Sequence, residues 1–354
     1  MSGGYFTNDT FLRTRLCFHC TDSNAQHPYG LGWVSIASSA DGSNLAVGTG
    51  RWDFGQYADG GALYTSKSSG GFNWTRAATL PNFLALASSA DGLKLAATMG
   101  YGGLHTSTDG GSSWTKSPAS DAEIIGNYGC VRLHWETIAS SSDGSKLVAA
   151  TGYGDTCGRY LNLYTSTDSG ATWAVAPSSS PWNPGTVNDF YGLASSSDGT
   201  KFVAVNNLNG IYVTTNSGAS WAKTSAPAHN WKSVASSSDG LRLVAGIYPG
   251  HSGSGIYLST NGGASWNKTT APDGPGIIWG GIASSADGSQ LAAASCTDGV
   301  YTSTDGGASW SKTSSPSSAC IIASSDDGTR LVTAGSGGVY TSNDGGAHWS
   351  TVLI

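Results

Sequence analysis

Five side chains of the sequence could act as acids, bases or nucleophiles: Glu136, Tyr191, Lys232, His229 and His251. The first three occupy the same position in consecutive repeats of the chain, so they would lie on neighbouring strands. A tyrosine beside a carboxylate can serve as a nucleophile with its base, an arrangement suited to the chemistry of sugars. Histidine exchanges a proton near neutral pH. The five residues are therefore candidate catalytic groups of an enzyme that acts on a carbohydrate or another small molecule.

A simpler interpretation exists for the charged residues of this group. The matching position of the other repeats holds apolar or small residues, namely Val34, Leu84, Gly280 and Cys320. Glu136 and Lys232 would then neutralise each other in a buried environment, where an unpaired charge is costly. This interpretation predicts a salt bridge that closes a central channel.

The irregular segments between the repeated ones are rich in aromatic, arginine and acidic side chains. Tryptophan and tyrosine rings can stack on the apolar face of a sugar, while arginine and aspartate bind hydroxyl groups or a carboxylate. The same loops would suit a flat apolar molecule or a peptide. The candidate ligand-binding residues are Arg51, Trp52, Asp53, Tyr57, Tyr128, Arg132, Trp135, Tyr153, Asp155, Arg159, Trp182, Trp231, Tyr248 and Trp279. Trp135, Trp231 and Trp279 recur at one aligned position, which also predicts a packing role.

Two signatures alternate along the chain and define the elements that must position these groups. One reads Ile-Ala-Ser-Ser-x-Asp-Gly-x-x-Leu at residues 36–45, and the other reads Tyr-Thr-Ser-Thr-Asp-Gly-Gly-Ala-Ser-Trp at residues 301–310. Asp-Gly between short apolar runs predicts a hairpin, and four such runs in each repeat predict a four-stranded antiparallel blade. The sequence thus predicts an all-β, seven-bladed β-propeller. Its blades are expected at about 33–81, 82–132, 133–187, 188–229, 230–277, 278–317 and 318–354.

The second signature resembles a known repeat. Residues 107–114, Ser-Thr-Asp-Gly-Gly-Ser-Ser-Trp, are similar to the Asp-box, also called the bacterial neuraminidase repeat. The resemblance implies a β-propeller with the box between the third and fourth strands of each blade. It leaves function open, because Asp-boxes occur in sialidases, xyloglucanases, photosystem assembly factors, sorting receptors and lectins. Sialidases differ from this chain in having six blades and a Phe-Arg-Ile-Pro motif.

The repeated aspartates are expected to be structural. An Asp or Asn side chain accepts hydrogen bonds from the amides of its own turn, and glycine supplies the positive φ that the turn needs. Asn216 and Asn261 stand in place of aspartate in two copies and can accept the same bonds. Because strands alternate in direction, both signatures fall at one end of the wheel. The irregular loops and the candidate site are expected at the opposite end.

The cysteines predict disulfides. Cys130 and Cys157 flank blade three in the way that Cys296 and Cys320 flank blade seven, which favours two disulfides and an oxidising compartment. Cys17 and Cys20 could form a tight disulfide or half of a zinc site. The sequence shows no matching second half, so we expect no metal and no cofactor.

Residues 1–32 precede the first expected blade and form an N-terminal extension. Residues 4–9 resemble the third strand of the last repeat, Gly-Val-Tyr-Thr-Ser-Asn-Asp. This half-repeat could add a strand to the rim, cover the pocket or pair with a neighbouring subunit. The last of these would make the protein a self-assembling structural unit.

Composition narrows the classes of partner. Charged residues make up 11% of the chain, the net charge is −6, and lysine and arginine form no run, so a nucleic-acid partner is not expected. No apolar stretch reaches the roughly eighteen residues of a membrane span. The Ser/Thr/Gly-rich composition and the sequons at Asn8, Asn73 and Asn267 favour a secreted glycoprotein whose signal peptide is not part of this chain.

Three functions fit these observations. The leading one is an extracellular, lectin-like recognition propeller that binds a glycan or a similar ligand through its aromatic-rich loops. The second is an enzyme with a pocket around Glu136, Tyr191 and Lys232 at the same end. The third is a self-assembling surface protein.

Overall fold

The structure is a computed structural model of the 354-residue chain. It describes residues 31–51, 61–67, 73–80, 83–118, 134–152, 162–177, 181–182, 190–207, 210–250, 253–274 and 276–352.

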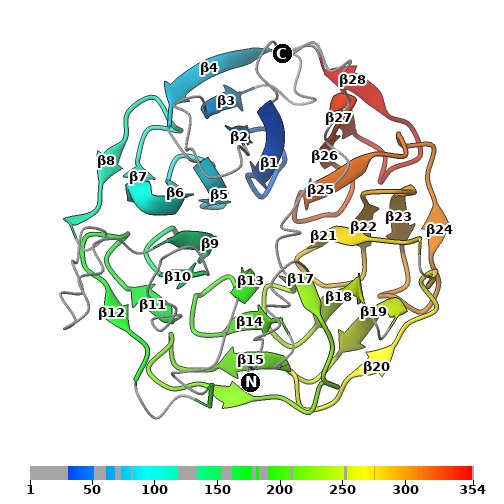
Figure 1. Cartoon of the computed structure of the whole chain (residues 1–354). Coiled ribbons are helices and arrows are strands. Elements are labelled where there is room, and N and C mark those ends of the chain that lie inside the picture. The colour runs from blue at the N-terminus through cyan, green and yellow to red at the C-terminus, as the bar shows by residue number, and fades with distance from the viewer. Residues whose placement is uncertain are drawn as a thin grey trace, which may run out of the picture.

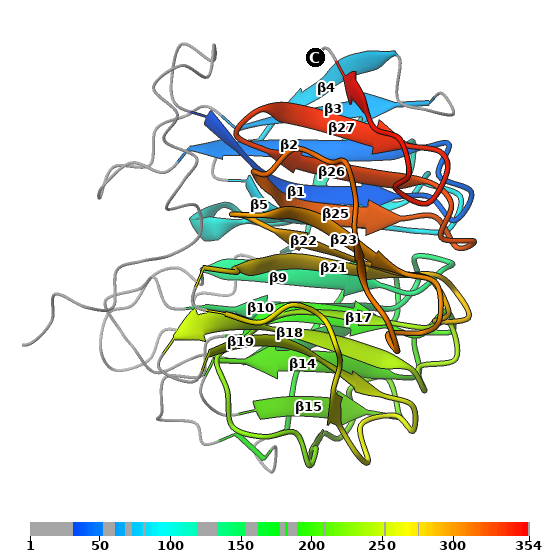
Figure 2. The same cartoon turned by 90° about the vertical axis from the view of Figure 1, so that its right-hand side faces the viewer.

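Seven four-stranded antiparallel sheets surround a central axis, as Figure 1 shows. In every sheet the four strands follow one another in sequence order, so each blade is one stretch of chain. Figure 2 shows the wheel from its side, with the strands running across its thickness. The expected all-β, seven-bladed propeller is confirmed.

Within each blade the four strands lie side by side, in order from the axis to the rim. The innermost strands are β1 (Leu31–Ser38), β5 (Phe83–Ser88), β9 (Trp135–Ser140), β13 (Phe190–Ser195), β17 (Trp231–Ser236), β21 (Trp279–Ser284) and β25 (Ala319–Ser324). The second strands are β2 (Leu45–Arg51), β6 (Leu95–Met99), β10 (Leu147–Thr151), β14 (Phe202–Asn206), β18 (Leu243–Gly250), β22 (Leu291–Ser295) and β26 (Leu331–Gly335). The third strands are β3 (Ala62–Ser66), β7 (Gly103–Ser107), β11 (Leu163–Ser166), β15 (Gly210–Thr214), β19 (Gly253–Ser259), β23 (Gly299–Ser303) and β27 (Gly338–Ser342). The rim strands are β4 (Trp74–Thr79), β8 (Thr115–Lys116), β12 (Ala174–Val175), β16 (Ala222–Lys223), β20 (Asn267–Lys268), β24 (Ser311–Lys312) and β28 (Ser350–Val352). One 3-10 turn, η1 (Gly100–Gly102), is the helical element among the described residues.

The Asp-boxes form self-contained turns between third and fourth strands. In blade six the carboxylate of Asp305 accepts hydrogen bonds from the Ser303 hydroxyl and the Ser309 amide, both at 2.8 Å. Gly307 adopts a φ of +93° that a side chain would strain. In blade four Asn216 accepts the equivalent amide bond at 2.9 Å. The box residues therefore have the structural role that the sequence predicts.

Side chains of adjacent sheets pack face to face, and the hydrophobic core lies between the blades. Leu63 of blade one shares a cluster with Phe83 of blade two. Val47 of blade one shares another with Val332 of blade seven. The wheel is thus held together by apolar contacts at each junction, including the one between the first and last blades.

A ring of backbone hydrogen bonds joins the turns between first and second strands. The amide of Ala40 donates to the carbonyl of Ala90 in the next blade at 2.8 Å, and the pattern continues from blade to blade. Asp326 of blade seven donates to Ala40 of blade one at 2.6 Å and completes the circle. Arg330 Nη1 spans the same junction to the Asp41 carbonyl at 2.6 Å. The wheel closes through these bonds, while each of its described sheets keeps four consecutive strands.

Candidate functional site

The innermost strand of every blade contains a β-bulge near the end of the wheel opposite the Asp-boxes. In β9, Trp135 pairs with Thr151 and Thr137 with Ala150, so Glu136 is the extra residue of the strand. The other six inner strands show the same shift. A bulge redirects the side chain of the extra residue and is frequent beside functional sites. The bulge residues are Val34, Leu84, Glu136, Tyr191, Lys232, Gly280 and Cys320.

Glu136 is held beside a histidine that precedes its strand. The Nδ1 atom of His134 lies 3.1 Å from Glu136 Oε1, and the two side chains are only 9% and 8% exposed. Gly152, the residue after β10, leaves room for the carboxylate, because an added Cβ would overlap the Glu136 Cγ atom. A backbone hydrogen bond joins the same two segments, because the Gly152 N–H donates to the His134 carbonyl at 2.8 Å. This pairing differs from the salt bridge expected between Glu136 and Lys232.

Lys232 contacts the neighbouring blade. Its ammonium group lies 4.2 Å from the centre of the Tyr191 ring, a distance suited to a cation–π interaction. Tyr191 belongs to β13 and Lys232 to β17, which pack against each other. The two side chains that the sequence places in consecutive repeats are therefore in contact.

These two contacts, His134 with Glu136 and Tyr191 with Lys232, occur at the bulges of adjacent blades and are together called the polar bulge cluster. It combines a carboxylate, an imidazole, a phenol and an ammonium group on three consecutive blades. Such a set can donate and accept hydrogen bonds toward a polar ligand at the mouth of the axis. His134 was not among the residues singled out from the sequence, because it lies outside the aligned position.

The aligned tryptophans beside the bulges are enclosed in the core. Trp135, Trp231 and Trp279 are 0–1% exposed. Trp231 stacks edge-on against Tyr257 with ring centres 5.3 Å apart, and its Nε1 donates to the Pro227 carbonyl at 3.1 Å. The structure shows the packing role for these rings, and their predicted part in ligand binding stays a prediction.

Trp182 and Tyr248 lie on the same end with different degrees of burial. Trp182 is 4% exposed and meets Phe190 and Tyr212 edge-on at 5.4 and 5.5 Å. Tyr248 is half-buried in β18, where its amide donates to the Asn230 carbonyl at 2.8 Å. Trp182 thus packs in the core, while the ring of Tyr248 keeps some access to solvent.

His229 belongs to a separate contact on blade five. Its Nε2 lies 3.3 Å from the Tyr257 hydroxyl, and its ring is 5.7 Å from that of Trp231. Burial lowers the pKa of His229, and the nearby Lys268 charge lowers it further. Lys268 is itself engaged by Asp273 at 2.5 Å. A neutral imidazole in this setting can act as a hydrogen-bond partner.

Several predicted site residues lie outside the described part of the chain. They are Trp52, Asp53, Tyr57, Tyr128, Arg132, Tyr153, Asp155, Arg159 and His251, together with Cys17, Cys20, Cys130 and Cys157. The backbone of Arg51 ends β2. The roles assigned to these residues stay predictions.

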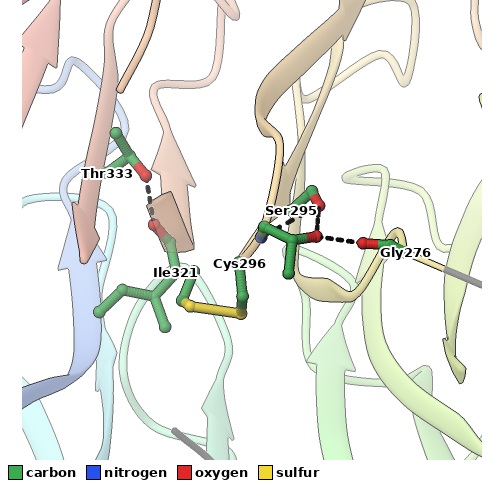
Figure 3. Close-up of a disulfide and its surroundings, with 7 residues drawn as sticks. Gly276, Ser295, Cys296, Ile321 and Thr333 are labelled. Carbon is green, nitrogen blue, oxygen red and sulfur yellow. Dashed lines mark hydrogen bonds between the residues drawn. A yellow bond between two sulfur atoms is a disulfide. The ribbon is translucent and has the colours of Figure 1, made fainter. Parts of the chain in front are cut away.

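A disulfide joins blades six and seven at the bulge level. Cys296 follows β22 and is bonded to Cys320, the bulge residue of β25 (Figure 3). Gly280, the bulge residue of blade six, faces this bond, since an added Cβ would come within 2.8 Å of the Cys296 sulfur. The prediction for this pair is confirmed.

Within the described ranges, no group of three or more His, Cys, Asp or Glu side chains could hold a metal ion. The same residues include no helix that is long and apolar enough to cross a membrane.

Comparison with known proteins agrees with this architecture. Residues 301–312 match the family model of the BNR/Asp-box repeat. The chain is a seven-bladed Asp-box β-propeller. No curated protein matches the sequence of this Asp-box propeller.

Solved structures of low sequence identity share the fold of the Asp-box propeller. YCF48 from Cyanidioschyzon merolae has a TM-score of 0.60 and 15% identity, covering 90% of this chain and 96% of its own. A structure of YCF48 bound to D1 peptide has a TM-score of 0.58 and 16% identity, covering 92% and 93%. The GH74 enzyme of Niastella koreensis has a TM-score of 0.51 and 17% identity, covering 91% of this chain and 65% of its own. At these identities the likeness shows the fold alone.

Proposed function

We propose that this Asp-box propeller is a secreted recognition protein that binds a glycan or a similar polar ligand on the end opposite the Asp-boxes. The observation that carries the proposal is the polar bulge cluster. Three consecutive blades place charged or hydroxylated side chains at a position that is apolar, small or disulfide-bonded in the other four. A local break in an otherwise repeated structure is where a binding site is expected.

The contacts of the cluster favour binding over hydrolysis. Glu136 is the one carboxylate among the seven bulge residues, whereas most glycoside hydrolases use two carboxylic acids. The carboxylate is paired with His134, and the Lys232 ammonium group lies over the face of the Tyr191 ring. Side chains that are already oriented by neighbours lose little entropy when a ligand binds.

A peptide is the first alternative ligand to test. One of the proteins that share the fold was solved with a peptide bound. The candidate loops carry the aromatic side chains that either a sugar or a peptide would contact.

The test is a screen of the purified protein on glycan and peptide arrays with three variants. Glu136→Gln and Lys232→Met remove one charge each, and Leu84→Met alters the bulge residue of blade two as a matched control. We expect wild-type protein and Leu84→Met to retain the same glycans. The two charge variants should lose at least about ten-fold in affinity, because a hydrogen bond to a charged group contributes about 1.5–3 kcal/mol.

Other outcomes would redirect the proposal. Retention of peptides but no glycans would make the protein a peptide receptor. Release of sugar fragments that stops in Glu136→Gln would favour the enzyme. No binding on either array, with all variants folded, would contradict a recognition function.

A further inference from the structure

A second feature lies at the other mouth of the axis, on the end that carries the Asp-boxes. A hollow of about 140 Å³ opens there, enough for four or five waters at roughly 30 Å³ each. Its inner wall is formed by the last residue of every innermost strand, which is a serine in all seven blades. These serines are Ser38, Ser88, Ser140, Ser195, Ser236, Ser284 and Ser324.

The hydroxyl groups of these serines present acceptors to the hollow. Each donates its hydrogen to the backbone carbonyl of the next residue, at 2.7–2.9 Å. A hydroxyl that has used its one hydrogen keeps lone pairs that can only accept. The inner wall therefore offers seven oxygen acceptors around the axis.

The rim of the hollow supplies almost no donors. It is built from the turn residues whose amides form the backbone ring, so these N–H groups are already used between blades. The rim residues are Ala40, Ala90, Ser142, Ser197, Ser238, Ala286 and Asp326. No lysine or arginine is among the lining residues. The three serine hydroxyls of the rim are the donors that remain there, so an anion would find little to hold it.

Asp326 gives the rim a negative charge. It replaces the alanine or serine of the other blades, and its neighbours along the ring are Ala286 and Ala40. Burial raises the pKa of Asp326, and the adjacent Asp327 charge adds to the effect. By contrast, the aspartates that end these turns, such as Asp143 in blade three and Asp327 beside Asp326, accept hydrogen bonds that lower their pKa. A cation in the hollow would stabilise the charged form of Asp326, as the hydrogen bonds of the turns stabilise the charged form of those aspartates.

We propose that this hollow, the serine-lined mouth, binds a primary ammonium group. The group could belong to a small free amine or to a lysine side chain of a partner, because both present three N–H donors on a slender stem. The Asp326 carboxylate attracts the charge, and the ring of serine oxygens accepts its hydrogen bonds. This site lies at the opposite end from the polar bulge cluster and does not depend on the function proposed for it.

Calorimetric titration with n-butylammonium chloride tests the site in the full chain. Asp326→Asn keeps the backbone ring and removes the charge, while Asp273→Asn removes one exposed carboxylate elsewhere and is the matched control. We expect saturable binding to wild type, at least five-fold weaker binding to Asp326→Asn, and less than two-fold change in the control. Ala286→Asp adds a second rim carboxylate and should tighten binding.

Three further ligands decide the chemistry. Tetramethylammonium has the charge but no N–H, and butyrate has the stem with the opposite charge, so neither should bind. A capped pentapeptide with one central lysine distinguishes the sources. Binding ten-fold tighter than butylammonium would indicate a partner's lysine, and equal binding would indicate a free amine. Equal heats for butylammonium and tetramethylammonium, or no loss in Asp326→Asn, would overturn the proposal.

Discussion

The two ends of the wheel differ in which part of the structure repeats from blade to blade. At the Asp-box end the side chains repeat, and the turns that the structure describes make the same hydrogen bonds, as Asp305 and Asn216 illustrate. At the opposite end the backbone repeats, because every inner strand has its bulge, but the bulge side chain changes from Leu84 to Glu136 to Lys232. A constant backbone with a variable side chain allows a site to arise in some blades without disturbing the fold.

Acid should weaken the Asp-box end most, because many of its carboxylates act together. Hydrogen bonds from serine hydroxyls and turn amides lower the pKa to about 2 at seven positions, which are Asp41, Asp109, Asp143, Asp198, Asp287, Asp305 and Asp344. A folded-state pKa below the unfolded value of 3.8 stabilises the fold above about pH 4. That stabilisation is lost as the pH falls toward 2.

We therefore expect the Tm, followed by circular dichroism, to be level from pH 7 to 5 and to fall steeply between pH 4 and 2. Asp305→Asn, which copies the residue found at Asn216, has one titrating group fewer and should lose less on acidification. A Tm that stays level down to pH 2 would show that these bonds contribute little.

Neighbouring residues of the opposite end should differ sharply in their effect on stability. Trp231→Ala empties a fully buried site and is expected to lower the free energy of unfolding by about 3–5 kcal/mol. Lys232→Met removes the contact of the ammonium group with the Tyr191 ring and should cost about 1 kcal/mol. Urea unfolding measures both. Similar losses would mean that the bulge residue is part of the packing.

Removal of the disulfide is expected to have the next largest effect on the stability of the fold. Cys296 and Cys320 are 24 residues apart, and a cross-link that closes a loop of this size stabilises by about 3 kcal/mol. Replacing both cysteines with serine should lower the Tm under oxidising conditions and leave the strands intact by circular dichroism. An unchanged Tm would indicate that the bulge of blade seven holds its shape without the cross-link.

Ser141→Ala is the smallest change and tests one hydrogen-bonded turn. Its buried hydroxyl donates to Asp143 at 2.6 Å and accepts from the Lys146 amide at 3.0 Å. Leaving that amide without its acceptor should cost about 1–3 kcal/mol. Ser142→Ala removes an exposed hydroxyl from the same turn and should stay within about 0.5 kcal/mol of wild type. Equal effects of the two substitutions would contradict a special role for the buried hydroxyl.

The repeat made the fold and the Asp-box bonds predictable from the sequence. Asp-Gly turns, box tryptophans and one cysteine pair at matched positions indicated blades, turns and the Cys296–Cys320 bond. The aligned inner-strand position also brought Tyr191 and Lys232 into one group. These features are local or recur in register, so they can be read along the chain.

Other features required coordinates. A bulge shifts the register by one residue without altering the repeat length, so the sequence carries no mark of it at Glu136. Whether Trp231 faces a ligand or the next blade depends on how two sheets pack. The serine-lined mouth is formed by residues such as Ser140, which in the sequence belong to a repeated turn signature. That these serines line one common hollow depends on the assembly of all seven blades.

The backbone ring has a consequence for how such a chain can change. The bond from Asp326 to Ala40 is of the same kind as the bond from Ala40 to Ala90, so the junction of the last and first blades is built like its neighbours. Each described blade is also a single covalent segment. No blade is topologically first. The same wheel could be encoded from any blade onward, so circular permutation and the exchange of whole repeats can reshuffle the variable end while leaving the closure intact.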